Sequence, residues 1–435
     1  MKPRIYKIIS VLFLLLSFSF VFAVVRNVVF MIGDGMGLAL IDFSRIVLVG
    51  KDEKLSFEKF PVVGLVRTHS YNSLVTDSAA AATAYSCGSK TNNRYLGLSP
   101  DGKKMTHIIE LVKKNGKSTG LVTTVSITHA TPAGFVASLS SRDEVLVANQ
   151  YVELRDMVDI FLGGGIEYFI PSGQQGSKRK DDRNLLEEFR QFGFTVVTSK
   201  EELLNLPITK VNKLLGVFKY LDTTYFIDRE FLSRNDLPTL AEMSKVAIQI
   251  LLKNKNGFFL MIEGGKIDWA CHSNDIATAV AEVAEFNDAV ETVVEILKDV
   301  PDTLIIVTAD HETGGLSLSS KEYRFFPEKV VHQKISAAQI AKLLKGKNET
   351  EIKNKFFEFT GIDDLTKEEI EEIAKGDVVE IGRIISLRIE VGWSTKTHSG
   401  CSVPLYAIGK NAEVFSGVYD NTEVAKKIIQ LMNLK

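Results

Sequence analysis

The chain has 435 residues, and its 52 lysines and arginines nearly balance its 54 aspartates and glutamates, for a formal net charge of −2. This balance excludes a general nucleic-acid-binding protein, which would carry a basic excess. The three cysteines, Cys87, Cys271 and Cys401, allow at most one disulfide, so a disulfide scaffold is excluded as well. The length suits one large domain with insertions or two smaller domains.

The N-terminus has the pattern of a secretory signal peptide. An apolar run over residues 8–22 ends at Ala23 and follows three basic residues, Lys2, Arg4 and Lys7. The run is short and lacks a stop-transfer flank, which favours a cleaved signal over residues 1–23; a retained anchor is the alternative. Cleavage takes the formal charge from −2 to −5. We expect an exported protein, periplasmic or extracellular, with no membrane contact after cleavage.

Five short apolar runs alternate with helical patterns, at residues 28–32, 120–125, 258–262, 304–308 and 403–408. Continuous apolarity is typical of strands buried on both faces. Helical patterns between the runs indicate a mostly parallel central sheet flanked by helices on both faces. The predicted fold class is therefore α/β. Amphipathic spacing predicts helices over 273–300 and over 105–114, the second ending at a C-cap signal.

Residues from about 321 to 390 form a charged stretch with helical patterns. Thr366 and Glu369 make a capping-box signature that opens a helix ending near Lys375. We interpret this stretch as a helix-rich insertion near the C-terminal third of a catalytic domain that spans residues 24–435. The insertion is expected to cover the C-terminal edge of the sheet.

Residues 75–90, VTDSAAAATAYSCGSK, place Asp77 and Ser78 directly before a run of alanines. Both residue types are good N-caps, because their side-chain oxygens accept the free N–H groups of the first helical turn. The alternative is that Ser78 is a nucleophile, since the positive end of the helix dipole favours an alkoxide or a bound anion. These residues alone leave both interpretations open.

Polar side chains follow four of the predicted strands; in chain order they are Asp34, Thr131, Glu263, Asp310 and His311. In an open α/β sheet the site lies outside the carboxyl ends of the strands, so these side chains are expected to meet. Crowded carboxylates repel one another unless cations lie among them. The convergence therefore indicates a metal site.

Two pairs have spacing that suits metal ligands. Asp268 and His272 are four residues apart, which places them on one helical face, although such a pair is more often a surface contact. Asp310-His311 offers adjacent oxygen and nitrogen donors that suit zinc. Three other histidines are expected to be structural or surface residues: His69, His107 and His332.

The chain resembles the alkaline phosphatases in six blocks that occur in the family's order: NVVFMIGDGMG, VTDSAAAATAYSCGSKT, THATPAGFVASLSSR, FLMIEGGKIDWACH, IIVTADHETGG and WSTKTHSG. The resemblance implies a metal-dependent hydrolase of phosphate monoesters (EC 3.1.3.1) that acts through a phosphoserine. It also implies a homodimer whose partners are phosphate monoesters and inorganic phosphate.

The resemblance assigns roles to individual residues. Ser78 would be the nucleophile, Asp77 would support its hydrogen bonds, and Arg142 would bind two phosphate oxygens as a planar guanidinium can. One Zn²⁺ would be bound by Asp268, His272 and His398. A second Zn²⁺ would be bound by Asp34, Asp310 and His311, with Ser78 as a further ligand. A third divalent metal, Mg²⁺ or Co²⁺, would be bound by Asp34, Thr131 and Glu263, and Co²⁺ could replace zinc.

Two positions near the substrate depart from the family's commoner pattern. His129 stands where many members have an acid, and Trp269 stands where many have lysine or histidine. A histidine supplies nitrogen instead of a hard anionic oxygen, which disfavours magnesium relative to zinc or cobalt. Trp269 carries no positive charge, so one phosphate contact would be absent.

Other functions compete with the phosphomonoesterase. One is a phosphodiesterase of the same superfamily, and another is a secreted metal- or phosphate-binding protein without turnover. The presence of both Ser78 and Arg142 disfavours a passive binder. A sulfatase would need proline where Ala80 stands, and the GDGMG turn after the first strand lacks the spacing of a dinucleotide fingerprint.

Overall fold

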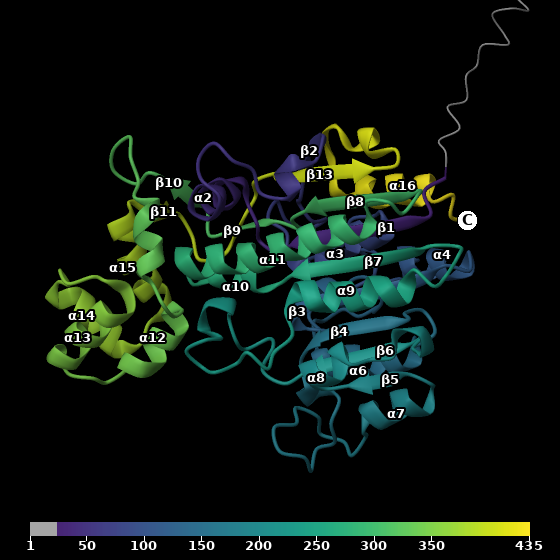
Figure 1. The fold of residues 1–435 in the computed structure, drawn as a ribbon, viewed down its shortest axis with the longest axis horizontal. Helices are drawn as coiled ribbons and strands as arrows, with labels where there is room; N and C mark the ends of the chain where they lie inside the picture. Colours follow the sequence, from purple (N-terminus) through teal and green to yellow (C-terminus); the bar gives the residue numbers. More distant parts are fainter. Residues whose placement is uncertain (1–23) are drawn as a thin grey trace, which may run out of the picture.

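The computed structural model describes residues 24–435, and the predicted signal peptide lies outside them. A ten-stranded sheet crosses the molecule in the order β14-β2-β13-β8-β1-β7-β3-β4-β6-β5. Helices cover both of its faces (Figure 1). The α/β class with a mostly parallel sheet is thus confirmed. Among the residues that the structure describes, no helix has the length and apolarity needed to cross a membrane.

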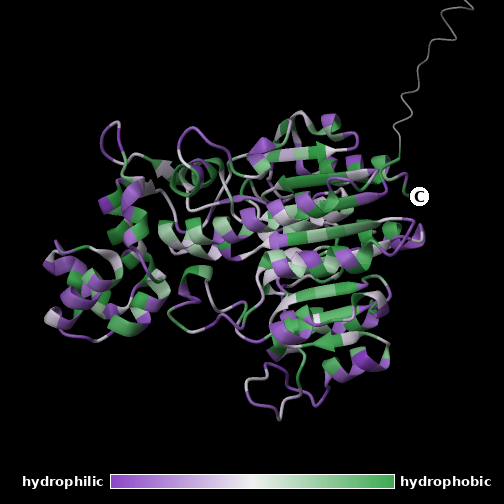
Figure 2. Cartoon of the chain, in the orientation of Figure 1, coloured by the Kyte–Doolittle hydropathy of each residue, from purple (hydrophilic) through white to green (hydrophobic). Residues whose placement is uncertain are grey.

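The predicted apolar runs form the centre of the sheet. Strands β1 (Asn27–Gly33), β7 (Phe258–Gly264) and β8 (Thr303–Thr308) are buried along their whole length. They are parallel to one another, and β3 (Ser118–Ser126) extends the parallel set. The outer strands are β2 (Val62–Arg67), β4 (Ile160–Gly164), β5 (Thr195–Val197), β6 (Leu214–Phe218) and β14 (Gly417–Asp420). Figure 2 shows the strands as the most apolar part of the fold.

The fifth predicted strand, β13 (Val403–Gly409), is antiparallel to both of its neighbours, β8 and β2. The physical reason is the route of the chain. It reaches β13 from β12 (His398–Ser399), which pairs with β9 (Glu312–Thr313) just beyond the carboxyl end of β8. A strand that enters the sheet at that end must run against the parallel set. Another short antiparallel pair joins β10 (Leu316–Leu318), which follows β9 in the chain, to β11 (Val391–Trp393), which precedes β12.

The predicted helix over 273–300 is in fact preceded by a break. Helix α10 (Lys266–His272) ends before Asn274, whose φ of +49° reverses the local backbone. Helix α11 (Ile276–Leu297) then begins with Asp275 as its N-cap. The helix predicted over 105–114 is also shorter: α4 (Ile108–Lys114) begins after a capping box formed by His107 and Glu110.

Two helical layers cover the sheet. Helices α9 (Leu240–Leu251) and α11 pack together on one face, whereas α3 (Ser78–Cys87) and α16 (Asn421–Leu431) pack together on the other (Figure 1). The remaining α-helices of the body are α2 (Leu38–Leu48), α5 (Ala130–Ala133), α6 (Glu144–Glu153), α7 (Leu185–Gln191) and α8 (Lys200–Leu204). Short 3₁₀ turns are Phe57–Lys59, Ile166–Tyr168, Ile208–Lys210, Phe226–Asp228 and Ala412–Phe415.

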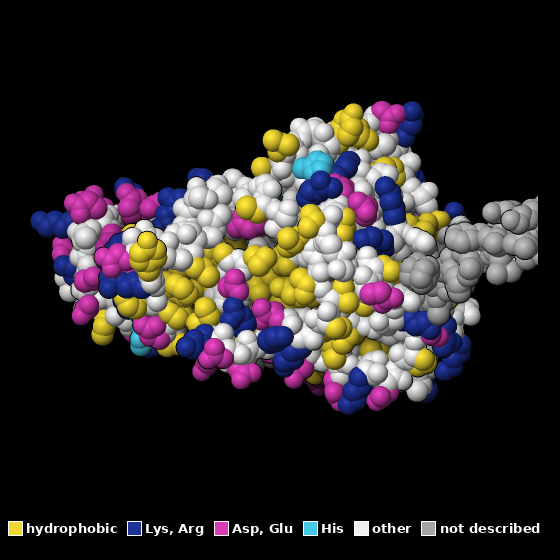
Figure 3. Space-filling model, turned by 90° about the horizontal axis from the view of Figure 1, so that it is seen from above, with side chains coloured by type: hydrophobic (Ala, Val, Ile, Leu, Met, Phe, Trp, Pro, Cys, Tyr) yellow, Lys and Arg dark blue, Asp and Glu magenta, His cyan; other side chains and the backbone are white. Residues whose placement is uncertain are grey.

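Four helices form a separate lobe beyond the carboxyl ends of the parallel strands (Figure 1): α12 (Ala337–Leu344), α13 (Glu349–Thr360), α14 (Lys367–Lys375) and α15 (Val378–Ile389). A 3₁₀ turn at Pro327–His332 leads into it. The capping box of Thr366 and Glu369 opens α14 as predicted. On the face of the lobe seen in Figure 3, acidic and basic side chains are mingled, so neither sign of charge dominates that face.

Candidate active site

The carboxyl ends of the central strands bring the predicted acids together. Asp34 directly follows β1, Glu263 lies near the end of β7, and Asp310 follows β8. All three side chains are fully buried, as is Thr131 on α5. These side chains come together because the buried strands that carry them are parallel, and parallel strands end at the same edge of the sheet.

A first group of ligands consists of Asp268, His272 and His398. The Asp268 carboxylate lies 3.3 Å from His272 Nε2 and 3.6 Å from His398 Nε2. The two Nε2 atoms are 3.2 Å apart. The four-residue spacing of Asp268 and His272 thus places them together on one face of α10.

Backbone carbonyls fix the orientation of both imidazoles in this first group. His272 Nδ1 lies 2.8 Å from Lys396 O, and His398 Nδ1 lies 2.8 Å from Thr76 O. A carbonyl oxygen only accepts, so each Nδ1 carries its proton and donates it. Burial lowers the pKa of His272, but the Asp268 carboxylate outweighs it and raises this pKa to about 9, so the pair attracts positive charge. In the neutral rings the lone pairs of both Nε2 atoms face each other beside that carboxylate. A shared cation satisfies this arrangement, and the second hydrogen bond is typical of metal-binding histidines.

A second group consists of Asp34, Asp310 and His311. His311 Nε2 is 3.4 Å from Asp34 Oδ1 and 3.2 Å from Asp310 Oδ2, and none of the three side chains is exposed. The ligand atoms of this group lie within 4.8 Å of one another. Those of His311, His398 and Asp268 do so as well, so the first and second groups adjoin.

The helix cap, one of the two roles that the sequence left open, belongs to Asp77. Asp77 is the N-cap of α3, and its carboxylate accepts from Ala80 N and Arg94 N, each at 3.0 Å. Ser78 is the first helical residue and is buried, and its Oγ lies 3.2 Å from His311 Nε2. The cap is therefore provided by the aspartate, which leaves the serine hydroxyl directed at the second group.

A third group surrounds the other side of Asp34. Ligand atoms of Asp34, Glu263 and His129 lie within 4.8 Å of one another, and Thr131 Oγ1 lies 3.5 Å from Asp34 Oδ2. His129 therefore contributes a nitrogen to this group directly. The sequence predicted His129 only beside the substrate, with an effect on the choice of metal.

The electrostatics of the third group call for a cation. Burial raises the pKa of Glu263 to about 7. Burial also raises the pKa of Asp34 well above its ordinary value, and the charges of Asp310 and Asp268 raise it further. Burial and the charge of Arg142 lower the pKa of His129 to about 3, so its ring stays neutral. A neutral imidazole cannot form an ion pair with the carboxylates beside it, but it can bind a metal together with them.

Unpartnered atoms give an independent test of metal binding. Buried oxygens without a hydrogen-bond partner include one from each central acid: Asp34 Oδ1, Glu263 Oε1 and Asp310 Oδ2. Buried polar atoms in proteins are nearly always paired, and leaving one bare costs about 1–3 kcal/mol. His129 Nδ1 is also buried without a partner. The donor set, mixed oxygen and nitrogen, fits zinc-like ions in the first two groups.

Two predicted substrate-binding residues line the third group. Arg142 is 26% exposed at its side chain, and its guanidinium contacts Asp77 Oδ2 and His129 Nε2 at 3.4 and 3.3 Å. Trp269 packs edge-on against His129, with ring centroids 5.8 Å apart. It brings bulk to the edge of the site and no charge.

Two threonines beside the ligands were missed by the sequence analysis. Thr123 Oγ1 donates to Glu263 Oε2 at 2.5 Å, from the adjacent strand in register with it. Thr313 Oγ1 lies 2.5 Å from Asp268 Oδ1 and 3.2 Å from His311 Nδ1. The usable signal for Thr313 was its position two residues after His311 in an extended segment, which turns both side chains to one side.

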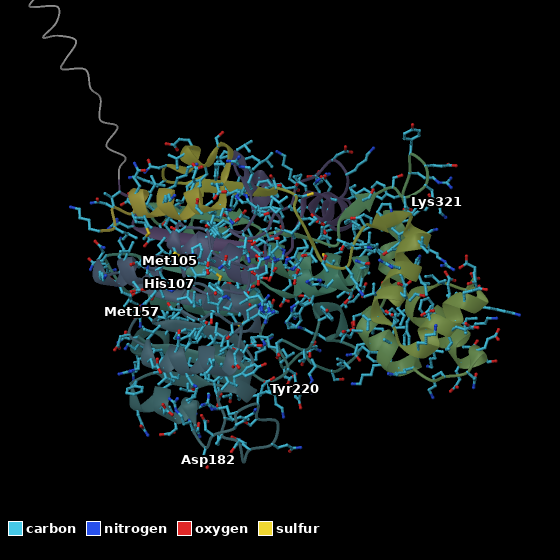
Figure 4. The ribbon with its side chains drawn as sticks, turned by 180° about the vertical axis from the view of Figure 1, so that it is seen from behind. Met105, His107, Met157, Asp182, Tyr220 and Lys321 are labelled. Atoms are coloured by element: carbon cyan, nitrogen blue, oxygen red, sulfur yellow. The ribbon has the colours of Figure 1, made fainter. Side chains whose placement is uncertain are left out.

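The remaining histidines lie outside these groups. His69 and His332 are exposed, and His107 is buried at the N-terminus of α4. His107 lies on the far side of the body from Lys321, which marks the segment that leads into the lobe (Figure 4). Burial lowers the pKa of His107 to about 4, as suits a neutral structural residue.

A model of the alkaline phosphatase family matches residues 25–434. The chain belongs to the alkaline phosphatase family. It is 36% identical to alkaline phosphatase 4 of Bacillus subtilis over 94% of this chain and 89% of that protein. The structure of Thermus thermophilus alkaline phosphatase superposes with a TM-score of 0.84 and 30% identity, over 94% of this chain and 92% of that one. The protein is thus a phosphomonoester hydrolase.

A further solved neighbour contains a bound metal. It is a variant of the alkaline phosphatase of the Antarctic bacterium TAB5 in which a histidine is replaced by aspartate, with Mg bound in a site called M3. It superposes on the phosphatase with a TM-score of 0.68 and 29% identity, over 95% of this chain and 99% of that one.

Proposed function

We propose that this phosphatase acts through a phosphoserine formed on Ser78, with Zn²⁺ in the first and second groups. The third group would hold a further divalent metal. The observation that carries the proposal is the position of Ser78 Oγ. It lies at the N-terminus of α3, buried, and 3.2 Å from His311 Nε2. A serine placed only as a helix cap would not be needed there, because Asp77 already caps α3.

The chemistry proceeds in two displacements. Ser78 Oγ attacks phosphorus, the bond from phosphorus to the ester oxygen breaks, and the alcohol leaves and takes up a proton. Water then attacks phosphorus, the bond to Oγ breaks, inorganic phosphate leaves, and Oγ regains its proton. Bound metal ions would lower the pKa of the serine hydroxyl and neutralise charge on the leaving oxygen. The positive end of the α3 dipole favours the same charges.

Arg142 is proposed to bind two oxygens of the phosphate. Its contacts with Asp77 and His129 are long, at 3.4 and 3.3 Å, so the guanidinium can exchange them for shorter bonds to an anion. A guanidinium has five donors in a planar fork, which matches two oxygens of one phosphate. Arg142 therefore orients the substrate rather than carrying the charge of the reaction.

The third metal is proposed to be cobalt or zinc in preference to magnesium. Magnesium prefers hard oxygen ligands, whereas His129 supplies nitrogen to this group. The magnesium-bound TAB5 variant supports this proposal, since an acid replaces a histidine in it. Trp269 leaves one phosphate contact unfilled, which is a further difference from members with lysine or histidine there.

We also propose the organisation of the mature protein. Residues 1–23 would be cleaved as a signal peptide, and residues 24–435 would form the catalytic domain, with an inserted subdomain at about 321–390. The mature protein would be a periplasmic or extracellular homodimer. N-terminal sequencing of protein from an expressing culture and its mass by light scattering test these points. An uncleaved N-terminus or a monomer would contradict them.

The experiment that tests the proposed metals is elemental analysis of the purified protein, paired with activity after chelation and after addition of single metals. We expect close to two zinc or cobalt ions per chain plus a third divalent ion, and loss of activity on chelation that zinc or cobalt restores. Full activity in a metal-free protein would refute the proposal. Comparison of a phosphomonoester with a phosphodiester separates the proposed activity from a diesterase.

A further inference from the structure

Asn274 separates α10, which carries Asp268 and His272, from α11. It is fully buried, and its φ of +49° is in the left-handed region. Asparagine tolerates this conformation better than most residues, because its short amide can hydrogen-bond locally. The residue lies two positions after His272, so its contacts bear directly on the first group.

Every hydrogen-bonding atom of the Asn274 amide has a partner. Nδ2 donates to Cys271 O and to Thr395 O, each at 3.0 Å. Oδ1 accepts from Arg383 Nε at 3.1 Å. Carbonyl oxygens only accept and guanidinium groups only donate, so the amide has a single consistent orientation. The side chain thus joins three segments: the end of α10, the loop at residues 394–397, and helix α15 of the lobe.

The loop at residues 394–397 holds the histidines of the first group. Its Lys396 carbonyl accepts the Nδ1 proton of His272, and the next residue after the loop is His398. The side chain of His272 is 36% exposed, so packing alone does not fix its ring. The hydrogen bond to Lys396 aims its Nε2 at Asp268 and His398. The loop that provides it is held by Asn274 and by backbone hydrogen bonds to Gly314 and Gly315.

Helix α15 of the lobe packs closely against Asn274. A Cβ at Gly382 would lie 2.4 Å from Ser273 O and 2.8 Å from Asn274 O, so only glycine lets the helix approach this far. Ser386 Oγ donates to Asn274 O at 3.1 Å and accepts from Trp393 Nε1 at 2.9 Å. The lobe therefore contacts both the backbone and the side chain of Asn274.

We propose that Asn274 is a positioning residue through which the lobe keeps His272 and His398 in the geometry that retains metal. The lobe then serves the first group. This inference rests on the proposed role of the first group as a metal site. Second hydrogen-bond partners of metal ligands typically change metal affinity by about 10–100-fold.

The test compares Asn274→Gly with Asn433→Gly in the holoenzyme. Glycine keeps the left-handed backbone at both positions, and Asn433 has a φ of +52° at an exposed site near the C-terminus. A second pair is Arg383→Ala, which removes the lobe's bond to Asn274, and Arg388→Ala, which removes a bond inside the lobe to Glu369. The readouts are the rate of zinc release to a chromogenic chelator and the visible spectrum of the Co²⁺-substituted protein.

We expect Asn274→Gly to release one zinc per chain about tenfold faster or more and to alter the Co²⁺ spectrum. Arg383→Ala should show a smaller effect in the same direction, and the two controls should match wild type. Excess zinc should restore kcat with KM unchanged. Zinc release at the wild-type rate in Asn274→Gly, or equal release in Arg388→Ala, overturns the inference. His272→Ala separates the two claims: if it loses no zinc, the proposed metal site itself is wrong.

Discussion

Replacing Thr313 with valine should weaken metal binding at both of the adjoining groups. The hydroxyl is buried and contacts Asp268 Oδ1 at 2.5 Å and His311 Nδ1 at 3.2 Å. A carboxylate only accepts, so Thr313 donates to Asp268 and its lone pair is free to accept from His311 Nδ1–H. That acceptance keeps His311 Nε2 free as a ligand. Valine has nearly the same shape and removes both bonds.

The expected magnitude follows from the packing around the hydroxyl. A Cβ placed at Gly35 would lie 2.8 Å from Thr313 Oγ1, so the backbone approaches the hydroxyl closely. A hydrogen bond to a charged group contributes about 1.5–3 kcal/mol. A loss of about 2 kcal/mol corresponds to roughly 30-fold weaker zinc binding.

Equilibrium competition with a zinc chelator measures this change, with Thr313→Ser as the matched control because serine keeps the hydroxyl. We expect Thr313→Ser to bind zinc within a few-fold of wild type. Zinc affinity in Thr313→Val equal to wild type would refute the reasoning. Equal weakening in both variants would do so too, because the lost group would then be the methyl.

Three further predictions address the substrate, the third metal and a buried carboxylate. Arg142→Ala should raise KM and weaken inhibition by inorganic phosphate while substantial kcat remains, since the metals carry most of the charge; complete loss of activity with metals retained would contradict this role. In steady-state activity titrations, wild type should respond best to cobalt or zinc, and the double variant His129→Asp with Trp269→Lys should respond to magnesium more strongly than wild type. An equal magnesium response in both proteins would show that His129 does not set the metal preference. Burial raises the pKa of Asp228 to about 6, so the folded protein binds this proton more tightly than the unfolded chain and loses stability as pH rises from about 4 to about 6. In urea titrations the advantage of Asp228→Asn over wild type should therefore grow by about 2 kcal/mol across that range, and a constant difference would contradict it.

The parts of the fold that the sequence predicted depend on local pattern. Continuous apolar runs identified β1, β3, β7 and β8, and the acids at their ends indicated where the site lies. The direction of β13 could not be predicted in this way. It depends on where the chain re-enters the sheet after β12, which is a property of the route and not of the apolar residues themselves.

The contacts that orient the site could not be predicted from the sequence, for a different reason. The carbonyls of Lys396 and Thr76, which fix the two imidazoles of the first group, belong to the backbone and carry no residue signal. In the sequence, nothing distinguishes Asn274 from its neighbours in the amphipathic pattern. Only its positive φ in the structure shows that α10 ends there. Likewise, the helical patterns in residues 321–390 predicted an insertion but gave no sign of its contact with the end of α10.

The most direct test of the central claim is detection of phosphate on Ser78. The holoenzyme is mixed with a phosphomonoester, quenched in acid within one turnover and digested, and the peptide that contains residues 75–90 is examined by mass spectrometry. We expect the mass of one phosphate on Ser78 in wild type and none in Ser78→Ala, whose turnover should fall by several orders of magnitude while its metal content is kept. Phosphate on another residue, or near wild-type turnover in Ser78→Ala, would contradict the account.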